Sequence, residues 1–262
     1  MSAAETGGAS APLTSDQVLD ELDFLTTVCH AVIVEALTIQ GAAGRSRPDD
    51  QFGPINDQAA GLAQVGSSIA QSEMFRLRRL NDALLAAGRP GETGRATSIS
   101  SDSVPEISLA PLTPEQFIDI VPREVAIGRA LGERYARLMP AVTTAPVFSG
   151  DLLTQIKAVI EDGQGYPAEL AGYRDPLGGV PSGKVVRATR REAADDSERN
   201  LLDTSDRAYR LLVELLSFAF TQPPDGQLGF SLQPAVEAMN ITDGINAELT
   251  RRGLLPPFTP DS

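Results

Sequence analysis

The sequence predicts an all-α protein, and three observations lead to that prediction. Apolar residues recur every three or four positions through several long segments, which is the period of an amphipathic helix. Glycine and proline stand at the ends of these segments, where they stop helices. No stretch shows the apolar and polar alternation that is typical of a strand, so no strand of consequence is expected.

Length, charge and cysteine content limit the functions to consider. The 262 residues are enough for one large core, and a single domain is expected over residues 14–255 after a disordered leader of residues 1–13. With 22 Lys and Arg against 35 Asp and Glu, the formal net charge is -13, so nucleic-acid binding is not expected. A lone cysteine, Cys29, excludes an intramolecular disulfide and fits the cytoplasm. The sequence contains no run of about 18 apolar residues, so no membrane span is predicted.

The first helix is expected over residues 15–40. Thr14 and the two residues after it are suited to cap its start, and Gly41 stops it. Its apolar stripe also contains Glu35. A buried carboxylate that lacks a partner is costly, so Glu35 requires either a partner or a function.

The second helix is expected over residues 57–87 and contains Glu73 and Arg76. Residues three positions apart on a helix project from the same face, so this carboxylate and this guanidinium should lie side by side. The next residues, 91–111, are rich in Ser, Thr and Pro and are expected to form a loop.

The third helix is expected to start at Thr113, to break or kink near Val121 because Pro122 follows, and to end at Pro140. It contains Glu133. The fourth helix is expected over residues 150–162, with Gly163 and the glycine and proline after it ending or bending the helix.

The remaining chain is expected to hold one loop and two more helices. Residues 168–200 are rich in Gly, Pro and charge and are interpreted as a long excursion. Helical periodicity returns over residues 203–221 and again over residues 234–252.

Several short strings resemble, in chain order, motifs of the ferritin-like domain found in the VioB / iminophenyl-pyruvate dimer synthase group. They are Val34–Ile39, Ser72–Leu77, Leu131–Tyr135, Glu161–Gly165, Asp206–Leu212 and Ala235–Leu249. The resemblance covers most of residues 13–255. It implies a ferritin-like four-helix bundle over about residues 14–167, additional C-terminal helices over residues 201–252, and a role in natural-product biosynthesis.

Two departures from that pattern concern metal binding. Arg76 stands where the family motif has histidine, and Gln164 stands where it has its second glutamate. The only histidine, His30, lies on a different helix face from Glu35. Ferritin-like iron and manganese sites use imidazoles as well as carboxylates. No metal ligand and no cofactor are therefore assigned. Arg76 is interpreted as occupying the volume, and supplying the positive charge, that a metal would have there.

The predicted site combines the acidic residues of the four bundle helices with Arg76. Glu35, Glu73 and Glu133 are the candidate proton-transfer groups, and Arg76 would orient a substrate or stabilise negative charge. The candidate substrate-binding residues are Glu161, Asp162, Gln164 and Tyr166. Of these, Glu161, Asp162 and Gln164 compete for one position facing the bundle.

The predicted function is metal-independent acid/base catalysis, such as a cyclisation or rearrangement of a small organic substrate. Two alternatives are kept: a di-iron or di-manganese oxidase or oxygenase with atypical ligands, and a non-catalytic ligand-binding or structural protein. A homodimer through the last two helices is also left open. Cys29 is expected to be a small core residue, and His30 a packing or surface residue.

Overall fold

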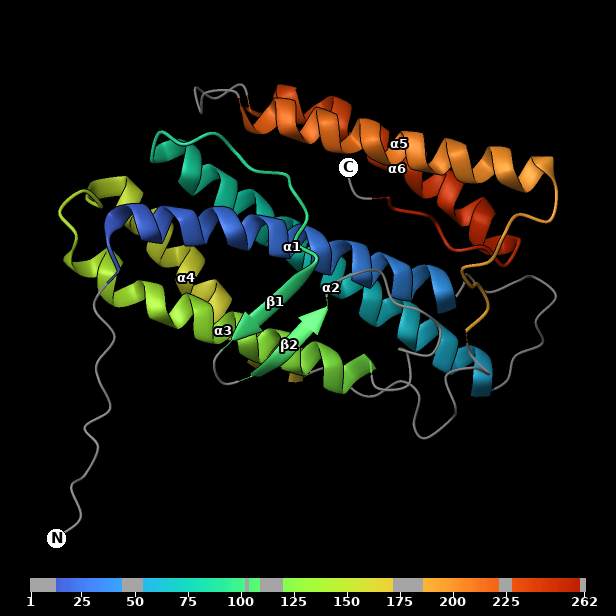
Figure 1. Cartoon of the computed structure of the whole chain (residues 1–262), viewed down its shortest axis with the longest axis horizontal. Coiled ribbons are helices and arrows are strands. Elements are labelled where there is room, and N and C mark those ends of the chain that lie inside the picture. Colours follow the sequence, from blue (N-terminus) through green and yellow to red (C-terminus); the bar gives the residue numbers. More distant parts are fainter. Residues whose placement is uncertain are drawn as a thin grey trace, which may run out of the picture.

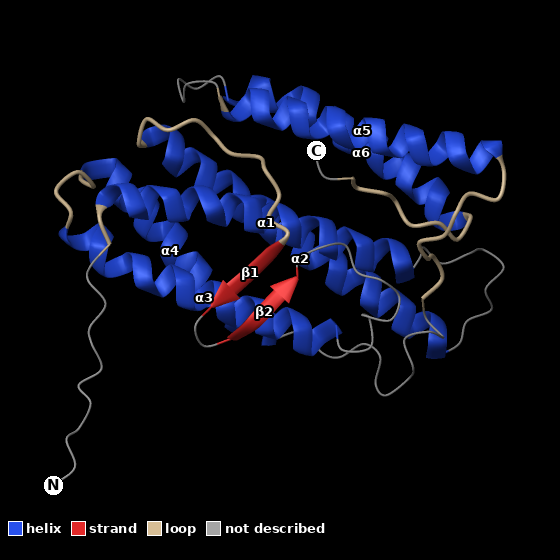
Figure 2. Ribbon diagram, viewed as in Figure 1, coloured by secondary structure: helices blue, strands red, loops and turns tan. Residues whose placement is uncertain are grey.

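The computed structural model describes residues 13–43, 54–101, 104–108, 120–171, 186–221 and 228–259. Within these residues the chain forms six α-helices and one two-stranded sheet (Figures 1 and 2), which confirms the all-α class. The elements are α1 (Ser15–Ala43), α2 (Pro54–Ala86), β1 (Ser98–Ser101), β2 (Val104–Ser108), α3 (Ile120–Thr144), α4 (Gly150–Ala171), α5 (Asp196–Phe220) and α6 (Leu228–Arg251). The expected leader, apart from Leu13, lies outside the described residues.

The first two helices lie close to their predicted bounds. After α2 the chain turns at Gly88, whose φ of 77° is in the left-handed region that favours glycine. The amide of Arg89 then donates to the carbonyl oxygen of Leu84 over 2.9 Å, so the end of α2 is capped by its own backbone.

The predicted bounds of α3 and α4 were wrong in two places, while the expected start at Thr113 lies outside the described residues. α3 begins at Ile120, which puts Pro122 in its first turn, where a missing amide hydrogen costs little. The break expected near Val121 stays a prediction, because residues 109–119 lie outside the described residues. Pro140 lies inside α3 instead of ending it. α4 likewise continues through the Gly163–Pro167 stretch to Ala171, because tertiary packing outweighs the intrinsic cost of its glycines and proline.

The start of α5 was also predicted too late, because a capping signal was overlooked. The Asp195 side chain accepts the amide hydrogen of Glu198 over 2.8 Å. The Glu198 side chain in turn accepts the amide hydrogen of Ala194 over 2.7 Å. This arrangement is a variant of the capping box in which the glutamate accepts from the residue before the cap, and Asp-x-x-Glu before a helical segment is the sequence signature. Both ends of the loop predicted over residues 168–200 are therefore helical and belong to α4 and α5.

The small antiparallel sheet was not predicted. Its register pairs Ser98 with Ser108 and Ile99 with Ile107. The Ile99 side chain is buried, and both strands lie against α3. Two strands of four and five residues are too short to show a periodic pattern.

The four helices α1 to α4 share the largest apolar core. α1 packs along α2 and α3 packs along α4, while α2 also contacts α4 and α1 touches α3. α1 and α2 run antiparallel and approach closely at Gly66, where an added Cβ would lie 2.6 Å from the carbonyl oxygen of Ala36. Among the described helices α1 alone is long and apolar enough to span a membrane, and 72% of its most apolar window is buried by its neighbours.

α5 and α6 form a separate pair beside α1. Figure 1 shows the segment that follows α6 running between this pair and α1. The pair is held to α1 by segments that flank it. The amides of Arg187 and Ala188 donate to the carbonyl oxygen of Ala42, and the amide of Leu255 donates to Thr189. Ala188 and Leu255 are buried in the core around the end of α1.

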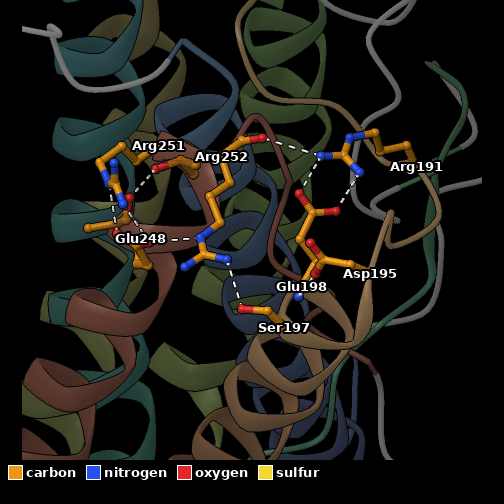
Figure 3. A network of polar contacts seen from close by, with 9 residues as sticks. Arg191, Asp195, Ser197, Glu198, Glu248, Arg251 and Arg252 are labelled. Atoms are coloured by element: carbon orange, nitrogen blue, oxygen red, sulfur yellow. Dashed lines mark hydrogen bonds and ion pairs between the residues drawn. The ribbon is translucent and has the colours of Figure 1, made fainter.

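Ion pairs at the start of α5 and at the end of α6 are joined to each other by hydrogen bonds from Arg191 to the carbonyl oxygen of Arg252 and from Arg252 to Ser197 Oγ (Figure 3). We call this group the terminal clasp; its charged members are Arg191, Glu198, Glu248, Arg251 and Arg252. Arg191 binds Glu198 through two hydrogen bonds of 2.7 and 2.8 Å. These bonds hold the pKa of Glu198 at about 2, and the pairs with Arg251 and Arg252 hold the pKa of Glu248 at about 2.

Candidate functional site

The centre of the candidate site is an ion pair on α2 that is almost completely buried. Glu73 is 0% exposed and Arg76 is 3% exposed. Arg76 Nη1 donates to Glu73 Oε1, so the side chains three positions apart meet as the helix spacing predicted. Charged groups at this depth have lost most of their hydration, so their interaction must compensate a large desolvation cost.

Two further residues, Asp162 on α4 and Arg79 on α2, extend this ion pair towards solvent. Arg76 Nε donates to Asp162 Oδ2 over 2.9 Å, and Arg79 Nη1 lies 3.4 Å from Asp162 Oδ1. The side chain of Asp162 is 34% exposed and that of Arg79 is 56% exposed. We call these four residues the charge chain, because they alternate in sign from the surface at Arg79 to the interior at Glu73.

Two buried side chains on neighbouring helices complete the interior end of the charge chain. Burial and the negative charge of Glu73 raise the pKa of the Cys29 thiol well above its ordinary value. Burial, the neighbouring Cys29 and Glu73 likewise raise the pKa of the Tyr135 hydroxyl, while Arg76 acts in the opposite direction. Both groups therefore keep their protons at neutral pH.

Gly163 sets the distance between α4 and the Tyr135 ring. A Cβ added at this position would lie 2.2 Å from the Cδ2 atom of Tyr135, closer than any real contact. Glycine therefore lets α4 pack directly on the ring. The same close approach brings the preceding residue, Asp162, within reach of Arg76.

Among the predicted substrate-binding residues, Asp162 reaches the centre. Glu161 and Gln164 are exposed, so the structure resolves the competition for this position in favour of Asp162. Tyr166 lies within α4, and its side chain is outside the described residues.

The other two predicted catalytic residues, Glu35 and Glu133, lie on α1 and α3. Glu35 is fully buried on α1, six residues after Cys29 and therefore about 9 Å further along the helix axis. Glu133 is half-buried on α3. It is two residues from Tyr135, so its side chain starts about 200° around the helix from the one that faces the charge chain.

The sequence predicted Cys29 as a core residue, which it is, but not that Cys29 and Tyr135 lie against the ion pair. No spacing rule connects positions on three different helices. The available signal concerned Tyr135 alone, because Tyr135 belongs to one of the resembling strings and Cys29 to none.

The donor set around Arg76 does not fit a di-metal centre. Within the described part of the chain, no three His, Cys, Asp or Glu side chains converge so that they could hold a metal ion. The guanidinium of Arg76 lies between Glu73 and Asp162, so a positive group already sits between those two carboxylates. Arg76 thus supplies positive charge at the place that the resemblance would give to a histidine.

His30 joins a different set of helices, as a packing residue. Its Nδ1 lies 2.8 Å from the carbonyl oxygen of Thr93, and its Nε2 lies 2.7 Å from the hydroxyl oxygen of Tyr209. A carbonyl only accepts, so Nδ1 carries the hydrogen, and in the neutral ring Nε2 accepts from Tyr209. His30 therefore links α1 to the loop after α2 and to α5.

Comparisons with protein-family models, with curated proteins and with solved structures found no match to this chain. The likeness to the ferritin-like group therefore rests on the short strings named above. Arguments about function have to start from the geometry of the charge chain.

Proposed function

We propose that the chain is a metal-independent enzyme in which α1 to α4 form a ferritin-like bundle. The packing of α1 along α2, α3 along α4 and α2 against α4 supports this architecture. Bundles of this kind build their sites from side chains that project inward from facing helices. Here Cys29, Glu73, Arg76 and Tyr135 project inward from three of them.

The reaction that these groups suit is proton transfer on a small organic molecule, as in a cyclisation or rearrangement. Glu73, which lies against Arg76, is the carboxyl group best placed to accept a proton. Tyr135 keeps its hydrogen and is suited to donate a hydrogen bond to an oxygen of the substrate. Arg76 remains charged at any working pH and would stabilise negative charge that develops on the substrate. Resemblance to the natural-product group supports the substrate class.

The observation that carries this proposal is the continuity of the charge chain. An ion pair that only packs a core has no need of a connection to the surface. This pair is linked through the half-exposed Asp162 to Arg79, which is exposed. Movement of Asp162 away from Arg76 would open a polar route from solvent to Glu73.

The test is a search for turnover with matched variants. Purified full-length protein would be incubated with a library of small organic acids and amines, and products identified by mass spectrometry. We expect products whose mass equals that of the substrate or differs from it by water. Turnover should persist with a strong chelator present and should fall at least about a hundredfold in Glu73→Gln.

The control is Glu214→Gln, which changes a carboxylate on the exposed face of α5 and should leave turnover unchanged. Loss of turnover with the chelator and recovery with iron or manganese would favour the di-metal alternative instead. Unchanged turnover in Glu73→Gln would contradict the proposed role of that residue.

A further inference from the structure

Two arginines, Arg95 and Arg190, meet over the segment that follows α6. We call residues 253–259 of this segment the strap. Arg95 Nη1 donates to the carbonyl oxygen of Phe258 over 2.7 Å, and Arg190 Nη2 donates to that of Pro257 over 3.3 Å. Partial burial and the positive charge of Arg95 lower the pKa of Arg190, which remains charged at neutral pH. The two guanidinium groups are therefore close enough to repel each other.

The carboxylates nearest to this arginine pair are engaged elsewhere. Glu92 accepts two amide hydrogens of its own loop. Asp206, which accepts the amide hydrogen of Thr259 on the strap, binds Arg210 over 2.6 Å. Within the described ranges, neither arginine of the pair has a carboxylate partner. Acidic residues outnumber basic ones by 35 to 22 in this chain, so a shortage of carboxylates does not explain the arrangement.

The backbone holds both arginines in place before any ligand binds. The residue that follows the first arginine is Ala96, whose amide donates to the carbonyl oxygen of Thr27 on α1 over 2.9 Å. The residue that precedes the second is Thr189, whose amide donates to the carbonyl oxygen of Gly253 on the strap over 3.1 Å. A site whose groups are positioned in advance loses less entropy when a ligand binds.

The charge and the hydrogen-bond donors of the pair select a class of anion. A guanidinium group carries five N–H donors, and each arginine of the pair uses one of them on the strap. Two positive charges favour an anion with two negative charges. A phosphate monoester carries about 1.5 to 2 negative charges at neutral pH and offers three acceptor oxygens, whereas a carboxylate has one charge and two oxygens.

We propose that Arg95 and Arg190 form a binding site for a phosphate dianion, which is either inorganic phosphate or the phosphate group of a small monoester. The bound anion lies between the two guanidinium groups and offsets their repulsion. It also ties the loop after α2 to the segment before α5 across the strap. This site is separate from the chemistry proposed at Arg76 and does not depend on it.

The first experiment is isothermal titration calorimetry of the full-length chain at constant ionic strength. Inorganic phosphate and glycerol phosphate are the probes, and dimethyl phosphate, a diester with a single charge, is the comparison. We expect a dissociation constant of about 1 mM or lower for at least one probe, and binding of the diester that is at least about tenfold weaker. Tighter binding of glycerol phosphate would identify a monoester as the ligand, and equal or weaker binding would identify free phosphate.

The second experiment repeats the titration with variants of the pair. Arg95→Gln and Arg190→Gln should each weaken binding of the better probe at least about tenfold, because each removes one charge and its donors. Arg207→Gln is the matched control. Arg207 is exposed on α5 and also bonds a backbone carbonyl, that of Asp203, so its replacement should leave the dissociation constant unchanged.

A third measurement separates loss of the anion site from loss of the strap. Hydrogen exchange at the amide of Leu255, which donates to Thr189, reports whether the strap stays docked in each variant. Arg190→Lys keeps the charge and a donor for the strap, so it should bind the probe more tightly than Arg190→Gln does.

Four results would overturn the proposal. Neither probe binds the wild-type chain at concentrations up to about 20 mM. The diester binds as tightly as the probes. The Arg207→Gln control weakens binding as much as the variants of the pair. Arg190→Lys binds as weakly as Arg190→Gln, which would show that the charge of Arg190 does not hold the anion.

Discussion

The charge chain and the terminal clasp use the same chemical groups in opposite surroundings. In the charge chain, Glu73 and Arg76 are buried between helices. In the terminal clasp, Arg191 and Glu198 meet at the rim of α5, where the arginine side chain is 38% exposed and the glutamate side chain 11% exposed. Water reaches the arginine of the second pair and neither group of the first, so the same kind of bond differs in how much its loss destabilises the protein.

The largest expected effect comes from removing only the buried arginine. Arg76→Met leaves Glu73 in the interior without the guanidinium beside it, which should lower the free energy of unfolding by about 3–5 kcal/mol. Urea titration measures this. Arg191→Met at the terminal clasp should have a smaller effect, because the Glu198 carboxylate keeps the hydrogen bond from the Ala194 amide and lies at the rim of the protein.

A double replacement distinguishes the buried charge from the lost packing. Combining Arg76→Met with Glu73→Leu removes both charges and should recover most of the lost stability. If the double variant were as unstable as Arg76→Met, the cost would lie in packing and not in an uncompensated carboxylate.

A steric change at the same place should have the next largest effect. Gly163→Ala forces a Cβ to within 2.2 Å of the Tyr135 ring, so α4 or the ring must move. We expect a loss of about 1–3 kcal/mol in a thermal or urea unfolding experiment. Gly165→Ala is the control, because its Cβ would meet nothing within 4 Å and alanine is the better helix former. Equal losses at both positions would contradict the close packing on Tyr135.

The hydrogen bond between His30 and Tyr209 should contribute less to stability than the charge chain and more than the terminal clasp. Tyr209→Phe keeps the ring contact with Phe258 but removes the hydroxyl that donates to His30 Nε2. The expected loss is about 1 kcal/mol. Amide hydrogen exchange should quicken in α5 more than in α3 and α4, since His30 joins α5 to α1. Uniform quickening in all helices would argue against a local role.

The terminal clasp should contribute the smallest effect, and it should depend on pH. Arginines lower the pKa of Glu198 and Glu248 from 4.5 to about 2 in the folded chain. The unfolded chain therefore binds protons at higher pH than the folded chain does. The stability from these residues is present above about pH 4.5 and is lost as the pH falls towards 2.

Urea midpoints measured at several pH values between these limits would show that loss as a slope. Glu198→Gln should make the slope shallower by removing one titrating group. An unchanged slope would show that Glu198 is not the group that titrates.

The sequence predicted the parts of this structure that depend on local spacing. Helical periodicity located all six helices, and the interval between Glu73 and Arg76 predicted their contact, because a helix brings such residues to one face. The composition of residues 91–111 predicted a loop, and β1 and β2 were missed within it. Strand pairing is a contact between two segments, and neither segment shows a pattern by itself.

The remaining errors share a physical cause, which is packing between helices. Gly163 reads as a helix stop in isolation, yet in α4 it is the residue that lets the helix rest on Tyr135. The choice among Glu161, Asp162 and Gln164 depended on the rotation of α4, which the glycine contact sets. Cys29 joined the site because α1 and α2 run antiparallel at close distance. Each of these facts requires the tertiary arrangement.

The segment after α6 has a consequence for how the chain is made. Leu255 covers the end of α1, and Phe258 packs with Val34 in the middle of it. α1 is synthesised before α2 to α6, whereas these two residues are synthesised after all six described helices. Part of the apolar surface of α1 must therefore wait uncovered while the other five are made, which exposes the nascent chain to aggregation during that time.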